Sequence, residues 1–504
     1  MPEKLLLGPL LGIENDSRYT FCFLAPKNTS TEQWHVAAGS QSQRAIPVTS
    51  TPQGLFFRTE IMLEPQADGR WETYRILEQN KPVADRFGRS QWRFYIPGLK
   101  ETPRLAYASC NGFSSASLVK KTTSPWELWH QLRKLHQEHP LSLLMMGGDQ
   151  VYADDLWIRI PALENWSRQA MSRQIAGKPP ARMIRELQRF YEQLYISAWS
   201  ADDAMSEMLA SIPSVMMWDD HDIFDGWGSY PDPLQQCPVF KQIFSVAREH
   251  FILFQLRSLH NKTMLHHNGD GLSWGLRFRD FLILGLDLRT QRTRKQVMNL
   301  QHWQEVKSWL NQQTPAQHFL VLSSVPVVYR SFALIEKYFE ATPWLEELED
   351  DVFDHWSAAP HQGERMKLIH NLLRYSRHLN SRHTVILSGD VHVGGLGQIK
   401  DQETGQQITQ IISSGIVHPP PSLLQWNGLL AVTKEPENDT EYQSVTTRLL
   451  TPFGAQGIIR SRNFMEISLG SDDKLWCRWH CEKPIDAVYP VAPQRYSNKT
   501  EEVS

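Results

Sequence analysis

The feature that most limits how this chain can fold is a series of short apolar runs separated by helical stretches. Each run is mostly apolar, as expected for a strand that is buried on both faces of its sheet. The runs lie at residues 105–109, 141–146, 214–218, 281–286, 319–323 and 383–387. Between them, apolar residues recur at helical spacing, most clearly in 126–138, 181–199, 243–256 and 366–379. Strands that alternate with helices predict an α/β layered core.

Five of these runs lead directly into residues that can bind a metal ion or a phosphate group. The residues at the five strand ends are Cys110, Asp149 with Tyr152 and Asp154, the segment Asp219-Asp220-His221-Asp222, Asp287 with Arg289, and Asp390 with His392. In open α/β sheets, ligands bind in the crevice beyond the carboxyl ends of the strands. We therefore expect these side chains to meet in one crevice, although they are far apart along the chain.

The mixture of residue types in this crevice favours two unlike metal ions. Several carboxylates in one crevice would repel one another, and a multivalent cation removes this conflict by stabilising all of the ionised forms. Cysteine and histidine suit a transition metal, whereas the surplus of carboxylate oxygens suits Ca²⁺, Mg²⁺ or Mn²⁺. Two metal ions that share one bridging carboxylate would use the whole set. Such pairs bind both the attacking and the leaving oxygen of an in-line displacement, usually at phosphorus.

The charge balance argues against a nucleic-acid partner, and the hydropathy argues against a membrane span. Lys and Arg total 52 against 55 for Asp and Glu, which gives a formal net charge of -3, and no basic run is present. Affinity for a nucleic-acid backbone comes from clustered positive charge, so no nucleic-acid-binding surface is expected. No stretch approaches the roughly 18 consecutive apolar residues of a membrane span. The sequence gives no indication of the oligomeric state.

Cysteine usage and the first residues of the chain predict a cytoplasmic location. The 5 cysteines are an odd number and are spread thinly, which suits a reducing compartment better than a disulfide framework. The apolar stretch at residues 5–13 lacks a clear basic start and a small-residue cleavage site, and we interpret it as a first strand rather than a signal peptide.

The chain is expected to comprise two domains and a tail. Residues 1–100 contain short apolar segments between Asn, Asp, Gly and Pro clusters, without a convincing amphipathic helix, which predicts an N-terminal β-sandwich domain. Residues 101–490 would form the catalytic domain. Residues 491–504 are a polar tail.

Three motifs together resemble the metallophosphoesterase superfamily. Residues 148–152 (Gly-Asp-Gln-Val-Tyr) match the Gly-Asp-x-x-Tyr motif of purple acid phosphatases and their relatives. Residues 219–222 are similar to the Gly-Asn-His-Asp/Glu motif, with Asp220 in place of Asn. Residues 389–392 are similar to the Gly-His-x-His motif, with Asp390 in place of the first His. Cys110, where other members carry Asp, makes the chain similar to PhoD-type alkaline phosphatases. The resemblance covers about residues 101–420.

This resemblance implies a fold, two metal sites and a catalytic residue. The fold would be a four-layer α/β/β/α sandwich preceded by a β-sandwich domain. An iron-type site, Fe³⁺ in the family, would be bound by Cys110, Asp149, Tyr152 and His392. A second site, Ca²⁺ in the family, would be bound by Asp149, Asp220 and Asp390. Mn²⁺, Mg²⁺ and Zn²⁺ are the alternatives. His221 would lie beside the scissile phosphate and donate a hydrogen bond to it or to the leaving group.

Some residues keep more than one interpretation. The strand at 319–326 offers Ser323 and Ser324 where many superfamily members have a histidine for the second metal, and His418 is a weak candidate to compensate. Asp219 is expected to assist catalysis with His221. Either Asp219 or Asp222 could instead orient His221 or a metal ligand. Arg289 could bind a phosphate oxygen or pair with Asp287.

The predicted function is metal-dependent hydrolysis of phosphoric esters, with metal-bound hydroxide attacking phosphorus in line. The substrate is therefore a phosphate ester. Two alternatives stay open. The first is a phosphodiesterase that uses the same site, and the second is a non-catalytic binding module in which metal only stabilises the fold.

Overall fold

The computed structural model describes residues 4–29, 31–258, 260–265, 270–330, 355–356, 358–432 and 444–496. Most of the predicted polar tail, residues 497–504, lies outside these ranges. No described helix is both long enough and apolar enough to cross a membrane.

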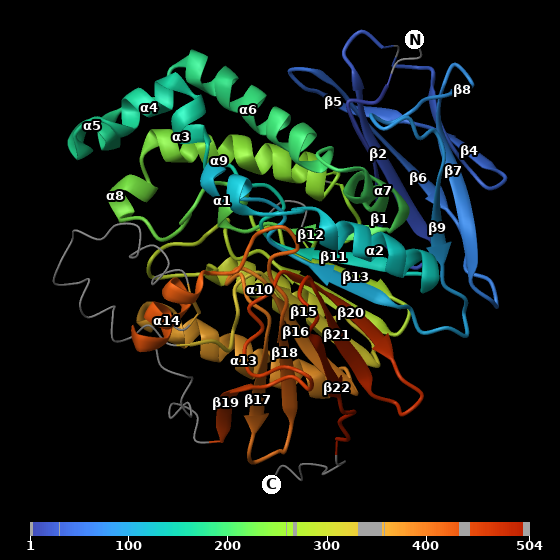
Figure 1. The fold of residues 1–504 in the computed structure, drawn as a ribbon, viewed down its shortest axis with the longest axis vertical. Helices are drawn as coiled ribbons and strands as arrows, with labels where there is room; N and C mark the ends of the chain where they lie inside the picture. The colour runs from blue at the N-terminus through green and yellow to red at the C-terminus, as the bar shows by residue number, and fades with distance from the viewer. Residues whose placement is uncertain are drawn as a thin grey trace.

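Two sheets face each other at the centre of the molecule (Figure 1). The first has ten strands in the order β22-β21-β20-β10-β11-β12-β1-β2-β6-β5. In that order they span Asp486–Val491, Leu475–Cys481, Asn463–Leu469, Leu105–Ala108, Leu143–Gly147, Ser214–Met217, Leu7–Ile13, Arg18–Pro26, Gly54–Met62 and Ile46–Ser50. The second has seven strands in the order β13-β14-β15-β16-β18-β17-β19. These span Trp274–Phe278, Phe281–Leu286, His318–Ser323, His383–Ser388, Gln407–Ile412, Gly395–Asp401 and Val445–Leu450.

Alternating side chains of the same strands build three separate cores, which makes the fold a four-layer α/β/β/α sandwich. Tyr107 and Met145 of the first sheet share the inter-sheet core with Leu322 and Leu387 of the second. Ala106, Leu144 and Met216 point the other way, against helices α2 (Glu127–Glu138), α6 (Ala181–Trp199) and α7 (Asp203–Ser211). Leu284, Val321 and Ile386 point from the second sheet toward α10 (Leu300–Asn311) and α13 (Gln362–His378). Strands buried on both faces need the predominantly apolar runs that the sequence has.

Most predicted helices are confirmed, but the helix expected at 243–256 differs. An α-helix, α9, covers Pro238–His250 and a π-helical segment covers Phe251–Gln255. The start of α9 is fixed by Pro238 at its first position and by the Cys237 side chain, which accepts the Phe240 amide. Strands β13 and β14 form a hairpin, with Arg279 at its turn in the left-handed conformation. The remaining described helices are α1 (Ala116–Lys121), α3 (Leu156–Arg159), α4 (Pro161–Ser167), α5 (Met171–Ala176), α8 (Asp232–Gln235) and α14 (Leu423–Val432).

The first hundred residues contribute to two sheets rather than forming a closed unit. Strands β1, β2, β6 and β5 extend the ten-stranded sheet, because β1 pairs in parallel with β12 through Gly12 and Ser214. A five-stranded antiparallel sheet packs against this extension (Figure 1). It consists of β4 (Gln41–Arg44), β3 (Trp34–Ala38), β7 (Arg70–Glu78), β8 (Lys81–Pro82) and β9 (Trp92–Ile96). The domain boundary at residue 100 stays a prediction.

Candidate metal centre

The backbone changes direction at the ends of the parallel strands. Strands β10, β11 and β12 run parallel in one sheet, and β14, β15, β16 and β18 run parallel in the other. Just beyond these ends, Cys110, Asp149, Asp390 and His392 have φ angles of 51°, 53°, 66° and 53°. Left-handed φ values are uncommon for residues other than glycine and cluster at functional sites. All four are residues that the sequence predicts as metal ligands.

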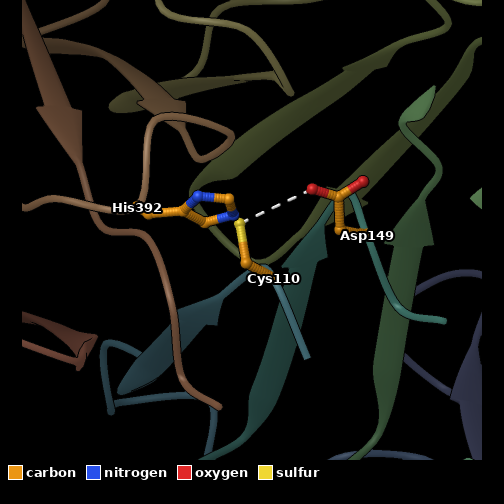
Figure 2. Close-up of side chains that lie close together, drawn as sticks. All are labelled: Cys110, Asp149 and His392. Atoms are coloured by element: carbon orange, nitrogen blue, oxygen red, sulfur yellow. Dashed lines mark hydrogen bonds between the residues drawn. The ribbon is translucent and has the colours of Figure 1, made fainter. Parts of the chain in front are cut away.

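One group at this edge combines a thiol, a carboxylate and an imidazole. Single ligand atoms of Cys110, Asp149 and His392 all lie within 4.8 Å of one another. The Cys110 Sγ lies 3.7 Å from Asp149 Oδ2, and Figure 2 shows the thiol between the carboxylate and the imidazole ring. Tyr152 joins this group from the side, because its hydroxyl lies 3.4 Å from His392 Nε2.

Two further groups overlap with the first and extend it. Asp149 also lies within 4.8 Å of Asp220 and His221, and Asp220 lies within the same distance of Asp219 and Asp390. The groups therefore form a continuous row in which Asp149 and Asp220 are each shared. A row of this kind has room for two metal ions that share a carboxylate.

Asp149 has an unusual environment for a carboxylate. It is 2% exposed, and its Oδ1 atom has no hydrogen-bond partner among the residues that the structure describes. Burial raises its pKa well above the usual range; His221 opposes this effect, whereas Asp220, Asp219 and Asp222 add to it. A buried carboxylate with an unpartnered oxygen is costly. A cation beside Oδ1 would satisfy that oxygen and stabilise the ionised form, so the donor set fits a metal ion.

The same reasoning applies to Cys110 and Tyr152. Burial raises the pKa of the Cys110 thiol, and the neighbouring Asp149 charge raises it further. Burial also raises the pKa of Tyr152 well above its usual value. Both groups would stay protonated without a cation, whereas metal ligands must be deprotonated. Their position beside Asp149 is therefore typical of residues that ionise on metal binding.

The His221 imidazole lies between two carboxylates. Its Nδ1 atom lies 2.9 Å from Asp154 Oδ2, and its Nε2 atom lies 3.8 Å from Asp225 Oδ1. Burial lowers the pKa of His221, but the charges of Asp154 and Asp220 outweigh burial and raise it well above 6.5. These carboxylates favour the protonated imidazole, and a protonated imidazole can donate a hydrogen bond to a phosphoryl oxygen or a leaving alkoxide.

The structure gives Asp219 and Asp222 different contacts, which the sequence alone could not distinguish. Asp222 accepts hydrogen bonds from the backbone amides of Gln150, Val151 and Asp219 and from the Gln255 side chain. It thus ties the loop after β11 to the loop after β12, and burial raises its pKa to about 7. Asp219 lies in the row of candidate ligands and accepts a hydrogen bond of 2.9 Å from the Ser324 hydroxyl.

Arg289 contacts two carboxylates of the row, Asp219 and Asp220. Its guanidinium is completely buried, forms an ion pair with Asp219 and lies 3.4 Å from Asp220 Oδ1. The same group donates to the Trp227 carbonyl at 3.2 Å. Asp287 accepts the backbone amide of Arg289 at 3.0 Å. A guanidinium in this position neutralises two carboxylates; contact with a phosphate stays a prediction.

Sequence reasoning overlooked Ser414 and gave little weight to His418. The Ser414 hydroxyl accepts the backbone amide of His392 at 2.8 Å and lies 3.2 Å from the Cys110 Sγ. The ring of His418 stacks on the ring of His392 with centroids 3.6 Å apart. Both follow strand β18, so the rule that places candidate site residues at strand ends would also have pointed to them.

Comparisons with known proteins agree with this geometry. The family of PhoD related phosphatases matches residues 78–343, which is just over half of the chain. A solved structure of PhoD matches 97% of this chain and 89% of its own, with a TM-score of 0.59 and 13% sequence identity. A purple acid phosphatase from yellow lupin (Lupinus luteus) seeds matches 96% of this chain and 74% of its own, with a TM-score of 0.53 and 10% identity. At these identities the two structures support the fold.

An uncharacterized protein of Saccharomyces cerevisiae is 26% identical over 406 residues, which are 68% of this chain and 56% of that protein. The chain thus spans little more than half the length of this curated relative. The family match, the structural likeness and the row of ligand groups lead to the same assignment: the chain belongs to the family of PhoD-related phosphatases.

Proposed function

We propose that this protein is a metal-dependent hydrolase of phosphoric esters, with a binuclear centre at the strand ends. The observation that carries the proposal is the row of overlapping ligand groups, in which Asp149 and Asp220 are shared. Family membership supports a phosphate-ester substrate.

The proposed metal sites follow the division of donor types along the row. Cys110, Asp149, Tyr152 and His392 would hold a transition metal, with Fe³⁺ as the first candidate. Asp149, Asp220 and Asp390 would hold a harder ion, with Ca²⁺ as the first candidate and Mn²⁺, Mg²⁺ or Zn²⁺ as alternatives. When bound, such a pair lowers the pKa of water and neutralises charge on phosphoryl oxygens.

The chain's own residues would orient and protonate the substrate. Asp154 fixes the His221 ring through Nδ1, which leaves Nε2 to donate to a phosphoryl or leaving-group oxygen. Asp219 is proposed to assist by keeping Arg289 and Ser324 in place beside Asp220. The row is buried, and exclusion of water strengthens each of these interactions.

Substitution of the shared carboxylate tests the proposal directly. Asp149→Asn removes the shared anionic ligand, so phosphatase activity should fall by at least about 1,000-fold and bound metal should fall with it. Asp155→Asn is a matched control, because Asp155 is exposed and its side chain forms no cap hydrogen bond. Full turnover by Asp149→Asn would contradict the proposal.

A substrate panel separates the proposal from its alternatives. Faster turnover of a mono-nitrophenyl phosphate than of a bis-nitrophenyl phosphate is expected for a phosphatase, and the reverse indicates a phosphodiesterase. Bound metal with no turnover of either ester indicates a non-catalytic module. We also propose a cytoplasmic location, which is supported by five unpaired cysteine thiols.

A further inference from the structure

A stacked pair of histidines flanks the thiol-containing end of the metal centre. The rings of His392 and His418 are nearly parallel, at 16°, with centroids 3.6 Å apart. Tyr152 adds a third ring to this group, with its centroid 5.5 Å from that of His418 and an interplanar angle of 17°. His418 is 6% exposed, so its position depends on the protein rather than on solvent.

Four hydrogen bonds and a glycine hold His418 in place. Its Nδ1 atom donates to the Pro419 carbonyl at 2.9 Å, because a carbonyl can only accept, and Nε2 then accepts from the Ser114 hydroxyl at 3.2 Å. The amides of Val417 and His418 both donate to the Cys110 carbonyl, at 3.3 and 3.1 Å. Gly415 has a φ of 76°, and a Cβ there would meet the His418 carbonyl oxygen at 2.4 Å. The turn therefore brings the backbone of His418 next to the backbone of Cys110.

The His392 ring, in contrast, has few polar contacts to orient it. Among the residues that the structure describes, the Tyr152 hydroxyl is its single hydrogen-bond partner, at 3.4 Å. Histidines that bind metals are normally oriented by a strong hydrogen bond from the second ring nitrogen to a carboxylate or a carbonyl. In this protein the ring of His418 stacks on the face of the His392 ring instead.

We propose that His418 is a positioning residue that fixes the plane of the His392 imidazole by ring stacking and so raises the affinity of the Cys110–His392 end for a transition metal. The inference rests on the proposed function and adds one residue to it. Because His418 is joined to Cys110 through the backbone, one segment sets the positions of both a thiol and an imidazole.

Two substitutions of His418 distinguish the contribution of its stacked ring from the contribution of its hydrogen bonds. His418→Phe keeps a flat ring and loses both ring hydrogen bonds, whereas His418→Gln keeps an amide that can hydrogen-bond and loses the ring. Co²⁺ is titrated into metal-stripped protein in competition with a chromophoric chelator. His418→Gln should weaken Co²⁺ affinity by roughly 10- to 100-fold, as substitutions around metal ligands do, and His418→Phe by much less. Unfolding midpoints of the stripped variants report folding separately.

Each outcome decides the matter. Wild-type affinity in His418→Gln would overturn the inference, and so would equal losses in the two variants.

If His418→Gln does not fold, Ser114→Ala replaces it. Loss of the Ser114 hydrogen bond should weaken Co²⁺ binding by roughly threefold, and unchanged binding would overturn the inference. His139→Ala, an exposed histidine, is the control. A wild-type protein that binds no Co²⁺ would refute the proposed function itself, whereas binding that is insensitive to His418 refutes the stacking role alone.

Discussion

The candidate metal centre has two ends that balance their charges in different ways. The thiol-containing end lies around Cys110, Asp149 and His392, and the all-oxygen end lies around Asp219, Asp220 and Asp390. At one end, Asp219 and Asp220 share the buried Arg289 guanidinium, so the protein supplies a permanent counter-charge. At the other end, Asp149 Oδ1 has no hydrogen-bond partner among the residues that the structure describes, and burial raises the pKa of the Cys110 thiol. The charge that favours ionised Asp149 comes from the titratable His221 imidazole rather than from a permanent cation. The all-oxygen end is thus prepared by the fold, whereas the thiol-containing end depends on a bound metal.

This difference predicts that the two ends respond differently to the loss of metal. Chelation should destabilise the thiol-containing end, because its buried polar groups then lack a counter-charge. The all-oxygen end should change less, because Arg289 stays in place. Four substitutions test the comparison.

The largest effect is expected for Arg289→Met, because this change leaves two buried carboxylates without their guanidinium. Loss of one partner of a buried ion pair costs about 3–5 kcal/mol in the free energy of unfolding. Chemical denaturation in the presence of a chelator measures this cost, with Arg44→Met at an exposed position as control. A cost below about 1 kcal/mol, the range of a surface ion pair, would show that the fold does not prepare the all-oxygen end.

Cys110→Ser should act on the other end alone. A hydroxyl is a poor replacement for a thiolate at a soft metal, so affinity for Co²⁺ or Zn²⁺ should fall by at least about 100-fold while Ca²⁺ affinity changes little. Titration of stripped protein with each ion gives the two values. Cys237→Ser, which changes a cysteine at the start of α9, is the control. Equal losses for hard and soft ions would refute the division into two ends.

His221→Gln should separate catalysis from metal binding. If His221 donates a hydrogen bond to the substrate as proposed, kcat should fall by roughly 100-fold or more in this variant. Elemental analysis should find unchanged metal content. A loss of metal from this variant would instead make His221 a ligand.

The pH dependence of the stripped protein gives the smallest effect and sharpens the comparison further. The pKa of Asp149 is raised in the folded state. Its stabilising contribution is therefore complete below the unfolded pKa of about 3.9, and is lost as the pH rises through the folded pKa. Asp149→Asn should remove this decline, so the free energy of unfolding of the stripped wild-type protein should fall more steeply with rising pH than that of the stripped variant. A wild-type protein whose stability has the same pH slope as the variant would contradict the account.

The sequence predicted the parallel strands and the side chains that meet at their ends better than it predicted contacts between distant parts of the chain. Mostly apolar runs identified β10, β11, β12 and β16, and the positions after these runs hold the candidate ligands Cys110, Asp149, Asp220 and Asp390, which lie together in the structure. Strand ends are local features, and the parallel topology then brings them together at one edge.

Other features depend on contacts that are distant in sequence. The pairing of β1 with β12 joins residues about two hundred positions apart, and no local pattern reports it. The Arg289 ion pairs and the His392–His418 stack arise for the same reason, since an arginine or a histidine after a strand has many potential partners until the sheets pack.

The central claim is that two metal ions share Asp149, and anomalous diffraction from crystals of the metal-loaded protein tests it most directly. The account predicts two anomalous peaks roughly 3.5–4 Å apart, one beside Cys110 and His392, the other beside Asp220 and Asp390, with Asp149 contacting both. A single peak, or two peaks that do not share Asp149, would contradict it.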